Sequence, residues 1–351
     1  MNPRSLLTLA IVAISLMACA GEGTSSKETS DEVVLVTHDS FSVSKPVIRA
    51  FERDTGLELR ILQSGDAGVA LNRALLTAGN PEGDVFFGVD NNLLSRALSE
   101  DLFEAYESPE LLKVDPSYVL DDEHRVTPVD HGEVCLNIDV GWFGSRGIDP
   151  PASLEDLVLE RYRGQLVVQN PATSTPGLAF LLATIANFGE DGWQDYWREL
   201  RANDVLVVDG WEEAYTTRFS GAGGSKGDRP IVVSYASSPP AEVIFAGEKL
   251  DEAPTAVVES SCFRQVEMAG ILRGARNPEG AEQLIDFMLS PMFQGDVPLS
   301  MFVFPVREGV PLPPEFERYA VVPAEPLELP AEEIGQNRDR WVREWTEIVL
   351  Q

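Results

Sequence analysis

The chain has 351 residues, a hydrophobic content of 44% and a formal net charge of −30. This length exceeds that of one ordinary hydrophobic core and predicts two lobes. A surface this acidic repels nucleic acid and anionic lipid, which excludes nucleic-acid partners, whereas it tolerates cationic small molecules.

Residues 1–18 have the composition of a signal peptide. Arg4 supplies the positive charge, and an almost wholly apolar run from Leu6 to Ala18 is too short to span a bilayer. The sequence Leu16-Met17-Ala18-Cys19 resembles the bacterial lipobox, in which the cysteine becomes the lipidated first residue of the mature protein. We expect export and attachment to the outer face of a membrane through Cys19. An ordinary signal peptide with a chance cysteine is the alternative.

Residues 19–32 are small and polar, and they predict a flexible tether. Apolar, β-rich runs then alternate with amphipathic segments, which predicts a parallel sheet with helices on both faces. The expected strands cover 33–37, 57–62 and 84–87, and the expected helices cover 44–55, 69–78 and 92–98.

A second set of α/β elements begins after Val140. A last helix, at about 331–350, places Trp341 and Trp345 on one face, a spacing typical of core packing. Two such lobes behind a signal sequence predict a clamshell that holds a solute between the lobes, at the carboxyl ends of the strands. The expected strands are 166–168, 205–208 and 231–234, and the expected helices are 154–159, 178–188, 193–200, 212–219 and 279–289.

The segment 169–178 joins a strand to an apolar helix and contains Thr173-Ser174-Thr175-Pro176. Proline suits the first helical turn, and Thr175 is the expected N-cap. Hydroxyl groups beside the positive end of a helix dipole favour a phosphate or carboxylate. A capped helix without a ligand is the alternative.

Polar and aromatic residues also follow other strands. Trp211 and Tyr235 lie in loops where they can sandwich a flat or cationic ring, although each alone is more often a packing residue. The first lobe contributes His38, Asp66 as an acceptor for a ligand amine, and Asp90 as the expected cap of the next helix.

Six segments in the same order resemble the thiamine-binding proteins of bacterial thiamine ABC importers. The resemblance implies a type II periplasmic-binding fold in which each lobe is a mostly parallel sheet flanked by helices. It also implies a ligand from the group thiamine, thiamine monophosphate and thiamine diphosphate, an ABC permease as partner, a monomer, and neither cofactor nor catalytic residue. The segments are Thr37-His38-Asp39-Ser40-Phe41, 88–94, 170–177, Gly210-Trp211-Glu212-Glu213-Ala214-Tyr215, 234–239 and Gln265-Val266-Glu267.

The same resemblance implies where the ligand binds. Asp66 matches the carboxylate that contacts the vitamin, and Ser174, Thr175 and Ser238 would meet its hydroxyl or phosphate end. Three positions depart from the family pattern: His38 replaces a tyrosine, Phe302 a tryptophan and Ala241 an aromatic residue. The implied ligand-binding residues are His38, Asp39, Ser40, Asp66, Ser174, Thr175, Trp211, Tyr215, Tyr235, Ser238 and Phe302.

Spacing alone leaves Cys135 and Cys262 open between a disulfide and two buried thiols. The resemblance places both on or beside the segments that cross between the lobes, and on that basis we expect a disulfide. It also implies a first lobe of residues 33–130 and 265–310, a second lobe of 131–264, and a C-terminal helical segment, 311–351, that packs on the lobes.

Parts of the sequence are also compatible with other functions. A clamshell receptor for a polyamine, a phosphonate or iron is the nearest alternative. A secreted hydrolase that uses Ser225 with His131 is another, but the G-x-S-x-G match at 223–227 lies in a flexible turn without the required strand and helix. No pair of histidines has metal-ligand spacing, and the absence of a P-loop assigns ATP hydrolysis to a partner. We expect no metal and no enzymatic activity.

Overall fold

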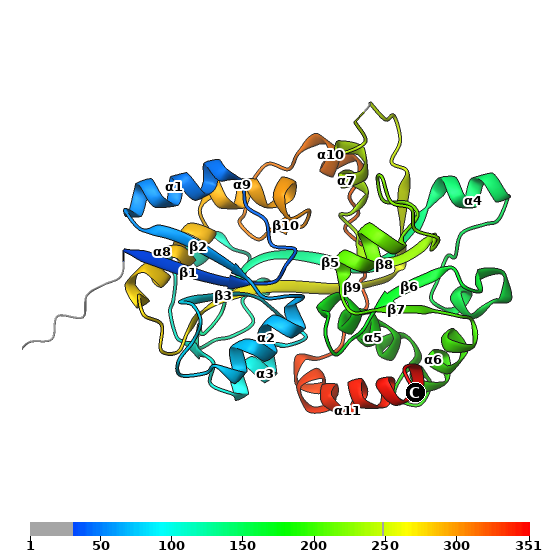
Figure 1. The fold of residues 1–351 in the computed structure, drawn as a ribbon, viewed down its shortest axis with the longest axis horizontal. Helices are drawn as coiled ribbons and strands as arrows, with labels where there is room; N and C mark the ends of the chain where they lie inside the picture. Colours follow the sequence, from blue (N-terminus) through cyan, green and yellow to red (C-terminus); the bar gives the residue numbers. More distant parts are fainter. Residues whose placement is uncertain (1–30, 248) are drawn as a thin grey trace, which may run out of the picture.

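The computed structural model describes residues 31–247 and 249–351. The expected signal peptide, the lipidation site Cys19 and residues 19–30 of the tether lie outside the described residues. Within the described part, one sheet runs through the whole molecule in the order β2-β1-β3-β9-β5-β8-β6-β7, with β10 beside β5 and β4 beside β9 (Figure 1). The strands are β1 Glu32–Thr37, β2 Glu58–Gln63, β3 Val85–Asp90, β4 Phe103–Glu104, β5 Thr127–Asp139, β6 Leu166–Gln169, β7 Leu206–Val208, β8 Ile231–Tyr235, β9 Thr255–Leu272 and β10 Phe304–Pro305.

Helices flank this sheet on both faces (Figure 1). Nowhere in the described ranges is a helix both long and apolar enough to cross a membrane. The α-helices are α1 Lys45–Thr55, α2 Ala67–Leu76, α3 Leu94–Ser99, α4 Val140–Arg146, α5 Thr175–Phe188, α6 Trp193–Ala202, α7 Pro239–Ile244, α8 Pro278–Met288, α9 Pro291–Ser300, α10 Pro314–Tyr319 and α11 Ala331–Val349. Short 3₁₀ helices are η1 Pro109–Lys113, η2 Pro116–Tyr118, η3 Glu155–Val158 and η4 Glu160–Tyr162, and η5 Glu213–Arg218 is a π-helix.

Each end of the sheet has the predicted α/β pattern. In the first lobe β1 pairs in parallel with β2 and β3, and in the second lobe β6 pairs in parallel with β7 and β8. The apolar side chains of β1, β3, β6 and β8 are buried because helices cover both faces of these strands, whereas the edge strands β2 and β7 are only partly covered. The expected strands and most of the expected helices are therefore confirmed, within the usual uncertainty of one or two residues at each boundary.

The two long strands β5 and β9 join the lobes. They pair antiparallel from Thr127–Ala269 to Asp139–Thr255, while β9 also pairs with β3 and β5 also pairs with β8. The parallel strands of the two lobes are thus parts of one continuous sheet. The exact division into lobes near residues 130 and 264 stays a prediction.

The C-terminal helix α11 packs on α6 of the second lobe and on α3 of the first (Figure 1). Trp341 and Trp345 are fully buried, which confirms the prediction that their shared face is a packing face. The Trp345 ring meets the Trp197 ring edge-on at 5.4 Å, and the Trp341 Nε1–H donates to Glu190 at 2.9 Å.

Two local predictions are wrong. The segment 154–159 was expected as a helix capped by Ser153, and it contains only the short 3₁₀ helix η3. Thr175 was expected as the N-cap of α5, but it is the first helical residue, and Ser174 precedes it with the extended dihedral angles of a cap (φ −121°, ψ 133°).

A disulfide joins Cys135 of β5 to Cys262 of β9. Both sulfur atoms are buried, and they pack against Ala236 at the end of β8. The bond therefore fixes the two crossing strands to each other in the middle of the sheet, where a cross-link constrains both lobes.

Two buried carboxyl groups also face each other across these strands. Asp130 of β5 is paired in register with Glu267 of β9, and both residues are buried. Burial raises the pKa of Asp130 and the pKa of Glu267, and the proximity of the two acids raises the pKa of Glu267 further. The pair is therefore expected to keep a proton at neutral pH.

Removing the disulfide is expected to destabilise the fold. The bond closes a loop with a sequence separation of 127 residues, and a cross-link over so long a loop contributes about 2–5 kcal/mol. The double variant Cys135→Ala/Cys262→Ala should lower the free energy of unfolding by that amount in urea titrations. The parent protein, refolded under reducing conditions, should have the same free energy of unfolding as the variant. Equal stability of oxidised and reduced parent would contradict this role.

The carboxyl pair predicts a pH dependence of stability. An acid whose pKa is raised by folding stabilises the folded state at low pH, and this contribution is lost as the pH rises through the folded pKa. Replacing Asp130 by Asn removes one buried acid, so Asp130→Asn should gain Tm relative to the parent at pH 8 and not at pH 5.5. Glu259→Gln, an exposed acid on the same strand as Glu267, is the control. A gain of the same size at both pH values would count against a raised pKa.

Candidate functional site

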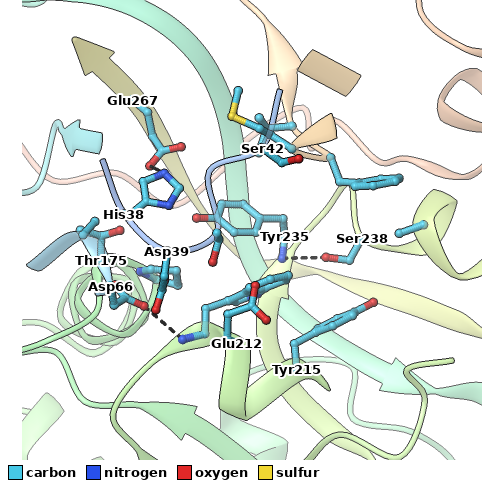
Figure 2. A pocket seen from close by; sticks show the side chains of 18 of the residues that line it. His38, Asp39, Ser42, Asp66, Thr175, Glu212, Tyr215, Tyr235, Ser238 and Glu267 are labelled. Carbon is cyan, nitrogen blue, oxygen red and sulfur yellow. Dashed lines mark hydrogen bonds and ion pairs between the residues drawn. The ribbon is translucent and has the colours of Figure 1, made fainter. Parts of the chain in front are cut away.

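A cavity of about 320 Å³ lies between the two lobes. Its volume falls within the range of ~300–1,000 Å³ found for small-molecule sites. Figure 2 shows its side chains converging from both lobes on one space. Ten of the eleven residues expected to bind ligand line it: His38, Asp39, Ser40, Asp66, Thr175, Trp211, Tyr215, Tyr235, Ser238 and Phe302.

Strand ends position these residues. His38 follows β1, Asp66 precedes α2 after β2, Thr175 opens α5 after β6, and Trp211 follows β7. Parallel strands bring their carboxyl ends to one edge of a sheet, so residues that are far apart in the sequence meet there. Ser174 is the exception among the expected residues, because it is buried beside Asp66 and does not line the cavity.

Asp66 links the two lobes across the cavity. One oxygen of its carboxylate accepts a hydrogen bond of 3.1 Å from the backbone N–H of Trp211, drawn as a dashed line in Figure 2. Burial raises the pKa of Asp66 to about 6, although the hydrogen bond from Trp211 opposes the shift. The carboxylate is therefore mostly ionised at pH 7.5, and it attracts a cation.

An aromatic wall forms the second-lobe side of the cavity. The Trp211 and Tyr215 rings stack with centroids 5.1 Å apart and planes 15° apart, and Tyr235 lies 6.5 Å from Trp211. Hydrogen bonds hold the polar ends of all three rings: Trp211 donates to Ser234, Tyr215 to Glu242 and Tyr235 to Gln265. The wall is thus rigid, and it can stack against a flat or cationic ring.

Two of the hydroxyl groups near the start of α5 have hydrogen-bond partners within the protein. Thr175 Oγ1 accepts a hydrogen bond from Gln265 Nε2 at 3.0 Å. Ser238 Oγ lies 2.8 Å from Ser234 Oγ and accepts from the Tyr235 N–H. Thr175 and Ser238 thus each have a protein partner, Ser174 Oγ is buried beside Asp66, and the contact of these three groups with a hydroxyl or phosphate stays a prediction.

Two aromatic side chains stand at the edge of the cavity. Phe302, expected from the resemblance, has a left-handed backbone (φ 56°), and its carbonyl accepts a hydrogen bond from Ser237. A non-glycine residue held in this conformation is characteristic of functional sites. Its ring lies 5.4 Å from that of Phe245, which is 68% exposed and was not predicted.

Two further carboxyl groups were not assigned to the site from the sequence. Burial raises the pKa of Glu212, and the nearby charge of Asp39 raises it further, whereas the Ser40 hydroxyl opposes the shift. Glu267 lies 3.7 Å from His38 Nε2, and burial lowers the pKa of His38 to about 4, so this imidazole is neutral at pH 7. Glu212 stood inside a segment used for the resemblance. Glu267, in β9, also stood inside a segment used for the resemblance, Gln265-Val266-Glu267, but it was not assigned to the ligand.

Other residues also line the cavity without having been assigned to it. Most are small or apolar and complete its walls. They are Ser42, Ala67, Pro176, Ala241, Phe245, Ser300, Met301 and Val303. Ser225, the nucleophile of the hydrolase alternative, does not belong to this set; it lies in the turn between η5 and β8, where its Oγ accepts from the Gly227 N–H.

Comparison with known proteins agrees with this site. Residues 80–334 match the family model of the bacterial extracellular solute-binding proteins. The thiamine-binding periplasmic protein of Salmonella typhimurium is 34% identical over 90% of this chain and 93% of its own length, and that of Escherichia coli is 32% identical over 90% and 93%. A solved periplasmic thiamin binding protein superposes with a TM-score of 0.79 at 30% identity, covering 91% of this chain and 96% of that one.

These matches span nearly the whole described chain and include both lobes. They confirm the two-lobed periplasmic-binding fold, and they make the chain an extracytoplasmic transport receptor and not an enzyme. The chain belongs to the bacterial extracellular solute-binding protein family and, within it, to the group of the thiamine-binding periplasmic proteins.

Proposed function

We propose that this protein captures thiamine between its lobes and delivers it to an ABC importer. The observation that carries the proposal is the buried Asp66 carboxylate beside the aromatic wall of Trp211, Tyr215 and Tyr235. Thiamine combines a cationic thiazolium with a flat aminopyrimidine, so it requires a negative charge and an aromatic surface in one cavity.

The hydrogen bond between Asp66 and Trp211 suggests how binding closes the protein. The two residues belong to different lobes, and both line the cavity. A ligand cation in contact with both would favour the closed arrangement over an open one, since a ligand shifts a conformational equilibrium by its differential affinity. The disulfided strands β5 and β9 would form the hinge.

The N-terminal sequence supports attachment to a membrane. Lipidation of Cys19 after removal of residues 1–18 would hold the receptor near its permease through the tether 19–32. The protein would then act as a tethered monomer that hands over one ligand at a time. A Cys19→Ser variant should be recovered in the soluble fraction of the cell envelope, whereas the parent should stay with membranes.

Calorimetry of the soluble chain, residues 20–351, tests the ligand. We expect thiamine to bind one-to-one with submicromolar Kd. Asp66→Asn keeps an oxygen for the Trp211 N–H but removes the charge, so it should weaken thiamine about 10–100-fold, the equivalent of ~1.5–3 kcal/mol for a charged hydrogen bond. Asp209→Asn, an exposed acid that does not line the cavity, is the matched control. Absence of any thiamine binding by folded protein would refute the proposed function.

Binding should also weaken at acid pH. The pKa of Asp66 is about 6, and a bound cation favours the ionised carboxylate, so protonation competes with binding as the pH falls below that value. The Kd for thiamine should rise between pH 7.5 and pH 5 in the parent, with a smaller rise in Asp66→Asn. If the Kd for thiamine changed with pH in the same way in both proteins, protonation of Asp66 would not be the cause of the weaker binding.

A further inference from the structure

We propose that Phe245 is a specificity-determining residue of the cavity, and that its ring and the ring of Phe302 form an aromatic gate that retains a flat ligand ring between the lobes. This inference rests on the proposed capture of thiamine, and it adds the side chain that holds the ring of the ligand at the edge of the cavity. It follows from the exposure of Phe245, from the contact between the lobes that the two rings make, and from the groups that fix them in place.

The first observation is the exposure of Phe245. This residue lines the cavity although it is 68% exposed. Single exposed apolar residues are common on protein surfaces. The other large, exposed apolar residues in the described part of the chain, such as Leu76 and Leu112, do not line the cavity, and none of them is aromatic. A ligand ring in the cavity would therefore cover apolar surface that the empty protein leaves in contact with water.

The second observation is that the gate joins the two lobes. Phe245 follows α7, the helix that comes after β8 of the second lobe, whereas Phe302 follows α9. Val303, next to Phe302, is buried in the core of the first lobe together with side chains of β1 and β3. The two rings lie with their centroids 5.4 Å apart and their planes tilted by 60°, a favourable arrangement for an aromatic pair. Closure of the lobes around a ligand therefore brings the two rings together, and opening separates them.

The third observation is that Phe302 is held firmly. The buried ring of Phe316, in α10, stacks on it with centroids 6.1 Å apart and planes 23° apart. The Ser237 hydroxyl donates a hydrogen bond of 2.6 Å to the Phe302 carbonyl, and the backbone of Phe302 is left-handed (φ 56°). Such a conformation persists only where the surroundings impose it. Phe302 is thus a fixed support for Phe245.

Helix α7 connects the gate to the aromatic wall. Its Glu242 is buried and accepts hydrogen bonds from the Tyr215 hydroxyl at 2.8 Å and from the Gly223 N–H at 2.5 Å. On its other side α7 packs on α10, the helix that carries Phe316 (Figure 1). Ala241 of α7 lines the cavity with only a methyl group, so Phe245, one turn later, is the ring that this part of the chain supplies. A flat ring held by the wall can then also contact the gate.

The rate of thiamine dissociation tests the gate. Stopped-flow measurements on residues 20–351 can follow dissociation through tryptophan fluorescence, because Trp211 lines the cavity. Phe245→Ala should release thiamine about three- to tenfold faster than the parent, the range expected for the loss of one aromatic contact. Phe245→Tyr keeps the ring and should release thiamine at the parent rate, whereas Phe245→Leu keeps only apolar bulk and should resemble Phe245→Ala.

Leu112→Ala is the matched control, because Leu112 is exposed and lies outside the cavity. It should leave the dissociation rate unchanged. Since Phe245 is largely exposed, the Tm of the empty Phe245→Ala protein should equal that of the parent, so a faster release reports on the ligand contact and not on a damaged fold.

The outcomes separate this inference from the function on which it rests. Tight thiamine binding by the parent, with a dissociation rate in Phe245→Ala within about twofold of the parent rate, would overturn the gate and leave thiamine capture standing. A parent-like rate in Phe245→Leu would overturn the requirement for a ring at this position. Failure of folded parent protein to bind thiamine would refute the proposed function and the gate with it.

Discussion

The pairing of β5 with β9 is the constraint on which the rest of the structure depends. Within the described residues, these two strands join the parallel strands of one lobe to those of the other in a single sheet, and the disulfide between Cys135 and Cys262 ties them together where their pairing shifts register. Because each is also hydrogen-bonded to a strand of one lobe, the ends of β1, β2, β6 and β7 open onto the same cavity. The site exists only as long as this pairing does.

A second feature of the molecule is that acidic side chains are buried close to one another. The acidic residues that give the net charge of −30 are spread over the whole sequence. The carboxyl groups that matter for ligand binding are those at the cavity and next to it. Asp130 and Glu267, of which Glu267 lines the cavity, form a buried pair that folding can tolerate with a shared proton, and Asp66 keeps its charge near neutral pH. A desolvated negative charge is unfavourable in the empty protein, so a cationic ligand gains affinity by relieving it.

Much of the fold and of the site was predictable because short stretches of the sequence are enough to indicate them. Val33 to Thr37 is an apolar, β-rich run, and polar residues such as His38 and Asp66 follow such runs directly, so sheet geometry alone places them at one edge. The long strand β9 was not predictable in the same way. Its 18 residues include Glu259, Ser260 and Arg264, which break any apolar pattern, since the strand passes from one lobe to the other and changes its neighbours on the way. Glu267 belonged to a segment used for the resemblance, but the sequence pattern of β9 does not indicate which of its side chains face the cavity. The partners of the Thr175 and Ser238 hydroxyls, such as Gln265, also come from distant parts of the chain and could not be read from the local sequence.

A crystal structure of residues 20–351 with bound thiamine tests the central claim most directly. The account predicts the thiazolium within the cavity, in contact with the Asp66 carboxylate and stacked on Trp211. Thiamine bound elsewhere, or bound in the cavity with its cationic ring turned away from Asp66, would contradict it.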